Sequence, residues 1–99
     1  MERGGYVYFM ANKSSSVLYV GVTSQLYNRV RQHKESFYTE SFTSKYKCFK
    51  LVYYEFHDHI GEAIEREKNI KNWKREWKNE LIDLKNPSWN DLSNEIEDM

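Results

Sequence analysis

The sequence has few of the residues that cross-link or interrupt a chain: one cysteine, one proline and four glycines among 99 residues. A single thiol, Cys48, cannot form an internal disulfide, which excludes the disulfide-stabilised secreted class and favours a reducing, cytoplasmic location. We expect Cys48 to be buried and structural. With 39% hydrophobic, 30% charged and 16% aromatic residues, the composition is that of one globular domain whose core depends on Tyr, Phe and Trp.

Long hydrophobic runs are also missing. The longest, VLYVGV at residues 17–22, is far shorter than the roughly 20 residues that a membrane-spanning helix needs. The N-terminal segment MERGGYVYFM lacks the charged, apolar and small-residue regions of a secretory leader. We therefore expect no targeting segment and no membrane role.

Several signatures of catalytic and metal sites do not occur. The sequence has no glycine-rich phosphate loop, no nucleophile-elbow serine and no C-x-x-C pair, so nucleotide kinases, hydrolases of the elbow type and zinc modules lose support. His57 and His59 flank Asp58 after a strand-like segment. Without a cysteine pair or a helical H-E-x-x-H arrangement, we interpret them as loop side chains and not as metal ligands.

Charge is unevenly distributed, although the formal net charge is zero. Residues 1–78 contain 14 Lys and Arg against 9 Asp and Glu, whereas residues 79–99 contain 1 against 6. A basic surface of this kind can attract a polyanion such as a nucleic acid, although a solvated, mixed-charge surface is the commoner meaning of such a pattern. We expect one domain over residues 1–92 and an acidic, frayed tail over residues 93–99.

Two strand-like segments open the chain. YVYFM at residues 6–10 and VLYVGV at residues 17–22 flank the polar segment ANKSSS at residues 11–16, which predicts a hairpin. If the strands pair symmetrically about this loop, Tyr8 lies opposite Tyr19 and both side chains point to one face of the sheet. The question is whether these two phenols only fill a core.

The remaining sequence predicts helices around one more strand. In the strand CFKLVYYEF, alternation places Leu51 and Tyr53 on one face and Val52 and Tyr54 on the other, which predicts a largely covered strand. The predicted elements are a helix capped by the hydroxyls of Thr23 or Ser24 and ending near Lys34, a loop over residues 36–46, the strand over residues 48–56, and one or two helices over residues 60–81.

Arg29 and His33 lie four residues apart and therefore share one face of the first predicted helix. Surface helices carry such pairs routinely. Because this helix directly follows the strand that bears Tyr19, both side chains are also in a position to project over the sheet towards the two tyrosines.

Glu67 is unusual because it falls on the apolar stripe of the second helical region, among Ile64 and Ile70. A carboxylate held there needs a cation, a metal or a proton, since burying a lone charge is costly. The alternative is a partly exposed Glu67 that pairs with Lys71, which lies four residues later in the favourable orientation.

Taken together, these motifs resemble the GIY-YIG nuclease family. The two short motifs are Y-V-Y, which ends at Tyr8, and Y-V-G, which begins at Tyr19. The likeness extends over residues 6–92 through the segments VLYVGVTSQLYNRVRQHK, EAIEREKNIKNW and NPSWNDL. The likeness is to the small stand-alone bacterial members, which are related to the catalytic domain of the excinuclease C subunit. The resemblance implies an α+β fold with a small three-stranded antiparallel sheet flanked by helices. This fold agrees with the pattern of predicted elements.

The resemblance also implies a function, namely cleavage of DNA phosphodiester bonds with one divalent ion, Mg²⁺ or Mn²⁺. Tyr8 and Tyr19 match the tyrosines of the two motifs, Arg29 and His33 match the helix pair, and Glu67 matches the metal-binding glutamate. Two features depart from the family pattern: Tyr6 replaces the first glycine, although Gly5 could supply some backbone freedom, and the downstream asparagine is either Asn79 or Asn86.

In the implied mechanism, Arg29 stabilises charge on the phosphate and Tyr19 fixes the geometry. Tyr8 orients and deprotonates the attacking water. A free phenol has a pKa of about 10 and is a poor base at neutral pH, so Arg29 or the metal would have to favour phenolate, or His33 would have to take the proton. The sequence leaves the choice between Tyr8 and His33 open.

Basic side chains are predicted to follow the DNA backbone without reading its sequence. With no second DNA-reading domain expected in 99 residues, we predict structure-directed or weakly sequence-specific cleavage. A nicked or branched DNA, or a larger protein partner, would suit such an enzyme, in a setting such as DNA repair or recombination. Two other classes stay open: a catalytically inactive nucleic-acid-binding module and a protein-interaction domain. The candidate backbone contacts are Lys34, Lys71, Lys74 and Arg75.

Overall fold

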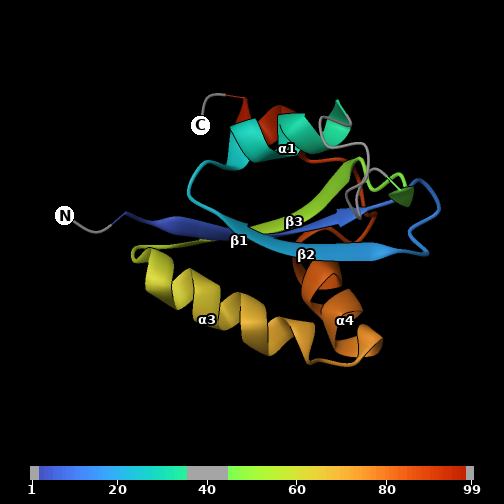
Figure 1. The fold of residues 1–99 in the computed structure, drawn as a ribbon. Helices are drawn as coiled ribbons and strands as arrows, with labels where there is room; N and C mark the ends of the chain where they lie inside the picture. Colours follow the sequence, from blue (N-terminus) through green and yellow to red (C-terminus); the bar gives the residue numbers. More distant parts are fainter. Residues whose placement is uncertain (1–2, 36–44, 98–99) are drawn as a thin grey trace.

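The computed structural model describes residues 3–35 and 45–97. Its centre is a three-stranded antiparallel sheet with the strand order β2-β1-β3 (Figure 1). The strands are β1 (Gly5–Ala11), β2 (Leu18–Thr23) and β3 (Lys50–His57). The predicted α+β architecture is confirmed, with β1 as the central strand.

Helices cover both faces of this sheet (Figure 1). One face carries α1 and the short 3-10 helix η1, and the opposite face carries α3 and α4. The predicted helical region over residues 60–81 is therefore two helices. The helices are α1 (Leu26–Lys34), α3 (Ile60–Lys71), α4 (Arg75–Lys85) and η1 (Ser93–Ile96).

Each face of the sheet has its own hydrophobic core, because successive side chains of β1 point to opposite faces. Val7 and Phe9 enter the core under α3 and α4. Tyr8 and Met10 enter the core under α1 and η1, which also contains the buried thiol of Cys48. The expectation of a buried Cys48 is confirmed.

The hairpin register differs by two residues from the symmetrical prediction. β1 continues to Ala11 and β2 begins at Leu18, so Tyr8 pairs with Gly21 and Met10 pairs with Tyr19. A shift of two residues preserves the faces of a strand. Tyr8 and Tyr19 therefore lie diagonally across the two strands, on the same face as predicted.

A β-bulge changes the alternation of β3. Phe9 pairs with Tyr53 whereas Met10 pairs with Leu51, so one strand holds an extra residue, Val52. Val52 and Tyr53 consequently both enter the core under α3, and Leu51 enters the other core. The prediction that Leu51 and Tyr53 share a face is wrong because strict alternation does not allow for the bulge.

The start of α1 also differs from the prediction. Gln25 is the N-cap residue, and no side chain caps the helix. The hydroxyl of Thr23 instead accepts a hydrogen bond from the Gln25 backbone N–H at 3.1 Å. Of the predicted loop over residues 36–46, residues 36–44 lie outside the described residues.

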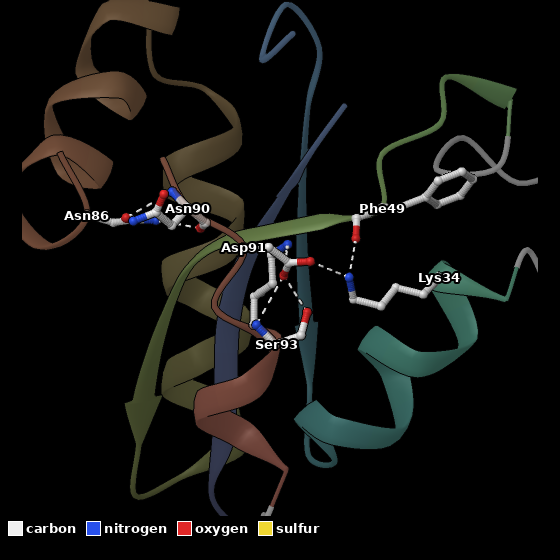
Figure 2. Close-up of polar contacts among 7 residues, drawn as sticks. Lys34, Phe49, Asn86, Asn90, Asp91 and Ser93 are labelled. Carbon is white, nitrogen blue, oxygen red and sulfur yellow. Dashed lines mark hydrogen bonds and ion pairs between the residues drawn. The ribbon is translucent and has the colours of Figure 1, made fainter. Parts of the chain in front are cut away.

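The segment after α4 carries the chain from one face of the sheet to the other. Asn86 caps α4 and is 5% exposed. Its amide donates to the carbonyl oxygen of Val52 at 2.9 Å and to that of Asn90 at 2.9 Å (Figure 2). Further along, the Leu92 N–H donates to the Leu51 carbonyl at 2.7 Å. These bonds attach the segment to β3 as it passes the sheet.

The segment ends in η1, which lies beside α1 (Figure 1). The predicted fraying of residues 93–99 is therefore wrong for Ser93–Ile96, because Ile96 is fully buried and anchors the helix. No helix in the described parts of the chain is both long and apolar enough to cross a membrane.

Asn86 and Asn79 provide a matched pair for testing this attachment. Asn86→Ala removes the partners of two backbone carbonyl groups, so we expect the free energy of unfolding to fall by about 2 to 3 kcal/mol. The Asn79 side chain accepts an exposed hydrogen bond from Arg75 Nε, and Asn79→Ala should change stability by less than about 0.5 kcal/mol. Urea unfolding measures both, and equal effects would contradict the assigned role of Asn86.

Candidate functional site

The candidate site is built on Tyr8, in the middle of the central strand. The side chain is fully buried and points towards α1. Its strand partner on β2 is Gly21, and its partner on β3 is Tyr54. Tyr8 is therefore held from both sides by the sheet and from above by the helix.

Gly21 allows this arrangement because it has no side chain. A Cβ atom placed on Gly21 would lie 2.6 Å from the Tyr8 hydroxyl oxygen and 2.8 Å from Cε2 of Tyr19. Real Cβ atoms do not approach other atoms so closely. The glycine of the second motif therefore provides the space in which the two tyrosines meet, with their ring centroids 6.1 Å apart. Sequence reasoning quoted Gly21 in a motif but did not assign it this role.

His33 completes a three-ring cluster with the tyrosines. It lies in the last turn of α1 and is 6% exposed. Its Nε2 atom is 2.9 Å from the Tyr8 hydroxyl oxygen, and its ring centroid is 5.3 Å from that of Tyr19. The prediction that His33 reaches the tyrosine pair agrees with this geometry.

Arg29 lies one helical turn before His33, on the same side of α1. Its guanidinium is hydrogen-bonded to the hydroxyls of Tyr8 and Tyr19. Gln32 accepts a further hydrogen bond from Arg29 Nη1 at 3.1 Å. Sequence reasoning missed Gln32, although its position three residues after Arg29 on a predicted helix is a usable signal.

Burial sets the protonation states of this cluster. Burial and the neighbouring Tyr19 raise the pKa of Tyr8 well above its ordinary value, and the opposing effect of Arg29 is smaller. Arg29 favours phenolate as expected, but in the protein alone its effect is too small to keep Tyr8 ionised at neutral pH. Burial and the positive charge of Arg29 lower the pKa of His33 to about 4.

Arg29 keeps its charge in this setting. Burial alone would lower the pKa of Arg29, but the hydrogen bonds and charges of Tyr8 and Tyr19 raise it above its ordinary value. At neutral pH the cluster therefore combines two phenols, a neutral imidazole and one cation. Such a set can bind an anion through Arg29 and accept a proton at His33.

Glu67 lies on α3, which packs on the opposite face of the sheet from this cluster. Its side chain is 13% exposed and its carboxylate pairs with Lys71 at 3.4 Å. This is the alternative that the sequence offered, a partly exposed Glu67 paired with the lysine four residues later, and metal binding by Glu67 stays a prediction. The preceding residue, Arg66, reaches Glu55 on β3. The buried residues of α3, Ala63 and Ile70, project between the directions of Arg66 and Glu67. Because Arg66 reaches β3, Glu67 lies on the other flank of α3, nearer β2.

Of the two histidines near the end of β3, His57 is the last residue of the strand and His59 is the N-cap of α3. His57 Nε2 contacts a Glu55 carboxylate oxygen at 2.5 Å, and Glu55 also accepts from Tyr53 and Arg66. This network joins β3 to α3. Across residues 3–35 and 45–97, no group of three or more His, Cys, Asp or Glu side chains has the geometry of a metal site, and the interpretation of His57 as a structural side chain agrees with these contacts.

The four basic residues predicted to contact DNA make contacts within the chain. Lys34 binds Asp91 and the Phe49 carbonyl, Arg75 donates to the Ser15 and Ser16 carbonyls, Lys71 pairs with Glu67, and Lys74 lies over the Trp77 ring. Three of these residues are exposed, namely Lys71, Lys74 and Arg75, whereas Lys34 is half-buried. Their contact with DNA stays a prediction.

Comparisons with known proteins agree with the geometry of the site. A model of the GIY-YIG catalytic domain matches residues 4–80, which is most of the chain. The chain belongs to the GIY-YIG catalytic-domain family. The recognition of this nuclease family from the sequence motifs is therefore confirmed.

Similar proteins cover nearly the whole chain. The UPF0213 protein of Syntrophus aciditrophicus (strain SB) is 33% identical over 77 residues, which are 78% of this chain and 87% of that protein. The UPF0213 protein of Clostridium perfringens (strain 13 / Type A) is 35% identical over 91 residues, or 92% and 96%. The solution NMR structure of a Bacillus halodurans UPF0213 protein superposes with a TM-score of 0.55 at 27% identity, covering 87% of this chain and 89% of that chain.

The departure from the GIY motif at Tyr6 has a packing explanation. Tyr6 lies half-buried against the rings of Tyr54 and Phe56, at centroid distances of 6.5 and 5.1 Å. Gly5 does not supply unusual backbone freedom, since none of the described glycines has a positive φ. It instead allows α3 to lie close to β1, because a Cβ on Gly5 would meet the Ile60 side chain at 2.2 Å.

Gly21 gives the first prediction for the GIY-YIG site. Gly21→Ala should force Tyr8 and Tyr19 apart and lower the free energy of unfolding by about 1 to 3 kcal/mol. Gly61→Ala is the matched control, because a Cβ on Gly61 meets nothing within 4 Å and alanine favours the helix by up to about 1 kcal/mol. Urea unfolding distinguishes them, and a Gly21→Ala protein as stable as the wild type would refute the close approach.

His33 gives a second prediction, on pH dependence. In the unfolded chain His33 has an ordinary pKa of about 6.5, whereas in the folded protein the pKa is about 4. Between these values the unfolded chain binds a proton that the folded protein does not, so the free energy of unfolding is fully present above pH 6.5 and falls as the pH drops towards 4. We expect a loss of up to about 3 kcal/mol over this window.

The measurement is urea unfolding at several pH values. His33→Gln should flatten the loss between pH 6.5 and 4.5, because the imidazole no longer titrates. The carboxyl groups of Glu55 and Asp91 also have lowered pKa values, and their contribution is lost at lower pH, as the pH falls through those values. If the free energy of unfolding of His33→Gln falls as much between pH 6.5 and 4.5 as that of the wild type, the result would argue against a neutral, buried His33.

Proposed function

We propose that this protein is a DNA endonuclease that hydrolyses phosphodiester bonds at the cluster of Tyr8, Tyr19, Arg29 and His33. The observation that carries the proposal is the 2.9 Å contact between the Tyr8 hydroxyl and His33 Nε2, beside the guanidinium of Arg29, in a chain of a nuclease family. A core alone would not require a cation and an imidazole beside the buried phenol of Tyr8 and the half-buried phenol of Tyr19.

Arg29 is the group that would bind the scissile phosphate. Its fixed, permanently charged guanidinium can donate to two phosphate oxygens at once. As negative charge grows on these oxygens in the transition state, the interaction strengthens. Gln32 holds Nη1 of Arg29 and would keep the guanidinium directed towards the tyrosine pair.

Proton transfer would run from water through Tyr8 to His33. The raised pKa of Tyr8 means that it cannot hold a phenolate at neutral pH. Its hydroxyl can take a proton from the attacking water while it gives its own proton to Nε2 of His33, which is neutral and 2.9 Å away. The water oxygen then bonds to phosphorus, and the bond from phosphorus to the leaving oxygen breaks.

His33 gains affinity for this proton as the reaction proceeds. A pKa of about 4 makes it a weak base in the free protein, because Arg29 lies close by. A bound phosphate brings negative charge to the same place and offsets that of Arg29. On this proposal Tyr8 relays the proton and His33 holds it, which answers the question that the sequence left open.

Glu67 is the residue that would hold a divalent ion. Its carboxylate is an oxygen donor of the type that Mg²⁺ and Mn²⁺ prefer, and its flank of α3 lies nearer β2, the strand that carries Tyr19. A Mg²⁺ site with one carboxylate, waters and substrate oxygens is common, so the donor fits, provided that Lys71 releases the carboxylate. When bound, the ion would supply charge stabilisation at the phosphate.

Nuclease assays test the proposal with one matched control for each variant. Tyr8→Phe removes the relay and should slow cleavage about 10²- to 10⁴-fold, whereas Tyr54→Phe, its neighbour on β3, should not. Arg29→Lys should cost about 10²-fold or more, and Arg31→Lys on the exposed side of α1 should be neutral. Glu67→Gln should abolish the metal-dependent rate, and exposed Glu65→Gln should retain it.

The substrates are linear, nicked, flapped and branched DNA, each with Mg²⁺, Mn²⁺ or a chelator. No cleavage of any of them would overturn the enzyme and leave the inactive nucleic-acid-binding module, whose affinity for DNA should fall steeply as salt rises. Cleavage that survives Tyr8→Phe, Arg29→Lys and Glu67→Gln would indicate a contaminating nuclease. A preference for nicked or branched DNA would support a role in repair or recombination.

A further inference from the structure

Asp91 lies at the meeting point of three parts of the chain that are far apart in the sequence (Figure 2). One carboxylate oxygen, Oδ2, accepts a hydrogen bond from Lys34 Nζ at 2.5 Å. The other, Oδ1, accepts from the backbone N–H groups of Leu51 at 3.2 Å and Ser93 at 3.0 Å, and from the Ser93 hydroxyl. Asp91 thus joins α1, β3 and the segment that leads to η1.

Lys34 is the last residue of α1 and is tied at two points. In addition to Asp91, its Nζ atom donates to the Phe49 carbonyl oxygen at 2.8 Å, just before β3 begins (Figure 2). The sequence had assigned Lys34 to the DNA backbone. In the structure its ammonium connects the end of α1 to the strand and to the C-terminal segment, and its contact with DNA stays a prediction.

These bonds form a closed path through the candidate site. His33 precedes Lys34 in the last turn of α1, and its Nε2 contacts the Tyr8 hydroxyl. Tyr8 belongs to β1, which pairs with β3, and β3 contains Leu51, which binds Asp91. Two links therefore hold α1 to the sheet near His33. One is the contact between His33 and Tyr8, and the other is the link from Lys34 through Asp91 to Leu51.

Within residues 3–35 and 45–97, polar contacts position the last turn of α1 more than apolar packing does. The buried apolar residues of α1, Leu26 and Val30, lie in its first and middle turns, and the residue after Lys34 is exposed. Charge-assisted hydrogen bonds have preferred directions and lengths, so they fix the position of a helix end more closely than an apolar contact does. An isolated surface ion pair contributes little to stability, but a carboxylate that also accepts two backbone N–H groups is held in place.

We propose that Asp91 is a positioning residue, which acts through Lys34 to hold the last turn of α1 so that His33 stays within hydrogen-bonding distance of Tyr8. Its catalytic consequence rests on the proposed function. Its geometric consequence does not, because it concerns only the contact between His33 and Tyr8.

The test that needs no activity is a proton NMR titration of the histidine rings in the full chain, with His33 assigned by comparison with His33→Gln. In the wild type His33 should titrate with a midpoint near 4. In Asp91→Asn we expect the midpoint to rise by about one pH unit or more towards the ordinary value of about 6.5, since the ring gains water as the helix end moves. Lys34→Met should have the same effect, and Lys34→Arg, which keeps the charge, should have much less.

Asp83→Asn is the matched control. Asp83 accepts a hydrogen bond from Trp89 Nε1 at 2.6 Å, so this variant also neutralises an aspartate that holds the C-terminal segment, but on the side of α4. It should lower stability without moving the His33 midpoint. The double variant Asp91→Asn, Lys34→Met should move the midpoint no further than either single variant, because both remove the same link.

With a cleavable substrate, Asp91→Asn should lower kcat about tenfold and leave KM unchanged, since Arg29 still binds the phosphate. A His33 midpoint that stays near 4 in both Asp91→Asn and Lys34→Met, with only a loss of stability as in Asp83→Asn, would overturn the proposal. If no DNA is cleaved by the wild type, the proposed function fails, and the NMR titration still decides the role of Asp91.

Discussion

The candidate site depends on the close approach of Tyr8 to Gly21. The phenol oxygen of Tyr8 lies 2.6 Å from the point where a side chain on Gly21 would begin. Because Gly21 has none, the Tyr8 ring can pack directly against the backbone of β2. Tyr19, two residues earlier on β2, then leans over the same space. Helix α1 closes the cluster with His33 and Arg29. The two tyrosine rings have room to meet because Gly21 carries no side chain.

Much of this arrangement could be predicted from the sequence because it depends on short-range periodicity. Side chains of a strand alternate between faces with a period of two residues. The predicted pairing of Tyr8 was wrong by two residues, so Tyr8 and Tyr19 still lie on one face. The 3.6-residue period of a helix placed Arg29 and His33 on one side of α1. Glu67 was conspicuous for the same reason, as a carboxylate on an apolar stripe.

The errors arose where distant parts of the chain meet. The bulge that turns Val52 and Tyr53 to one core depends on how β3 pairs with β1, some 40 residues away, and no local pattern encodes it. The acidic composition of residues 93–99 predicted fraying, but one apolar residue, Ile96, fits the space beside α1 and orders the segment. Protonation states likewise follow from burial, which is why Arg29 did not produce the phenolate that its charge alone predicts.

The sheet separates the charges of the site in a way that matters for binding. Arg29 belongs to α1, on the same face as Tyr8 and Tyr19, and Gln32 of the same helix holds its guanidinium. Glu67 lies on α3, across the sheet, and pairs with Lys71. The cation and the carboxylate of the site are therefore kept apart, so they cannot form a two-bonded ion pair with each other. On the proposed function, a DNA substrate that uses both would bind along β2, which is an edge strand of the sheet.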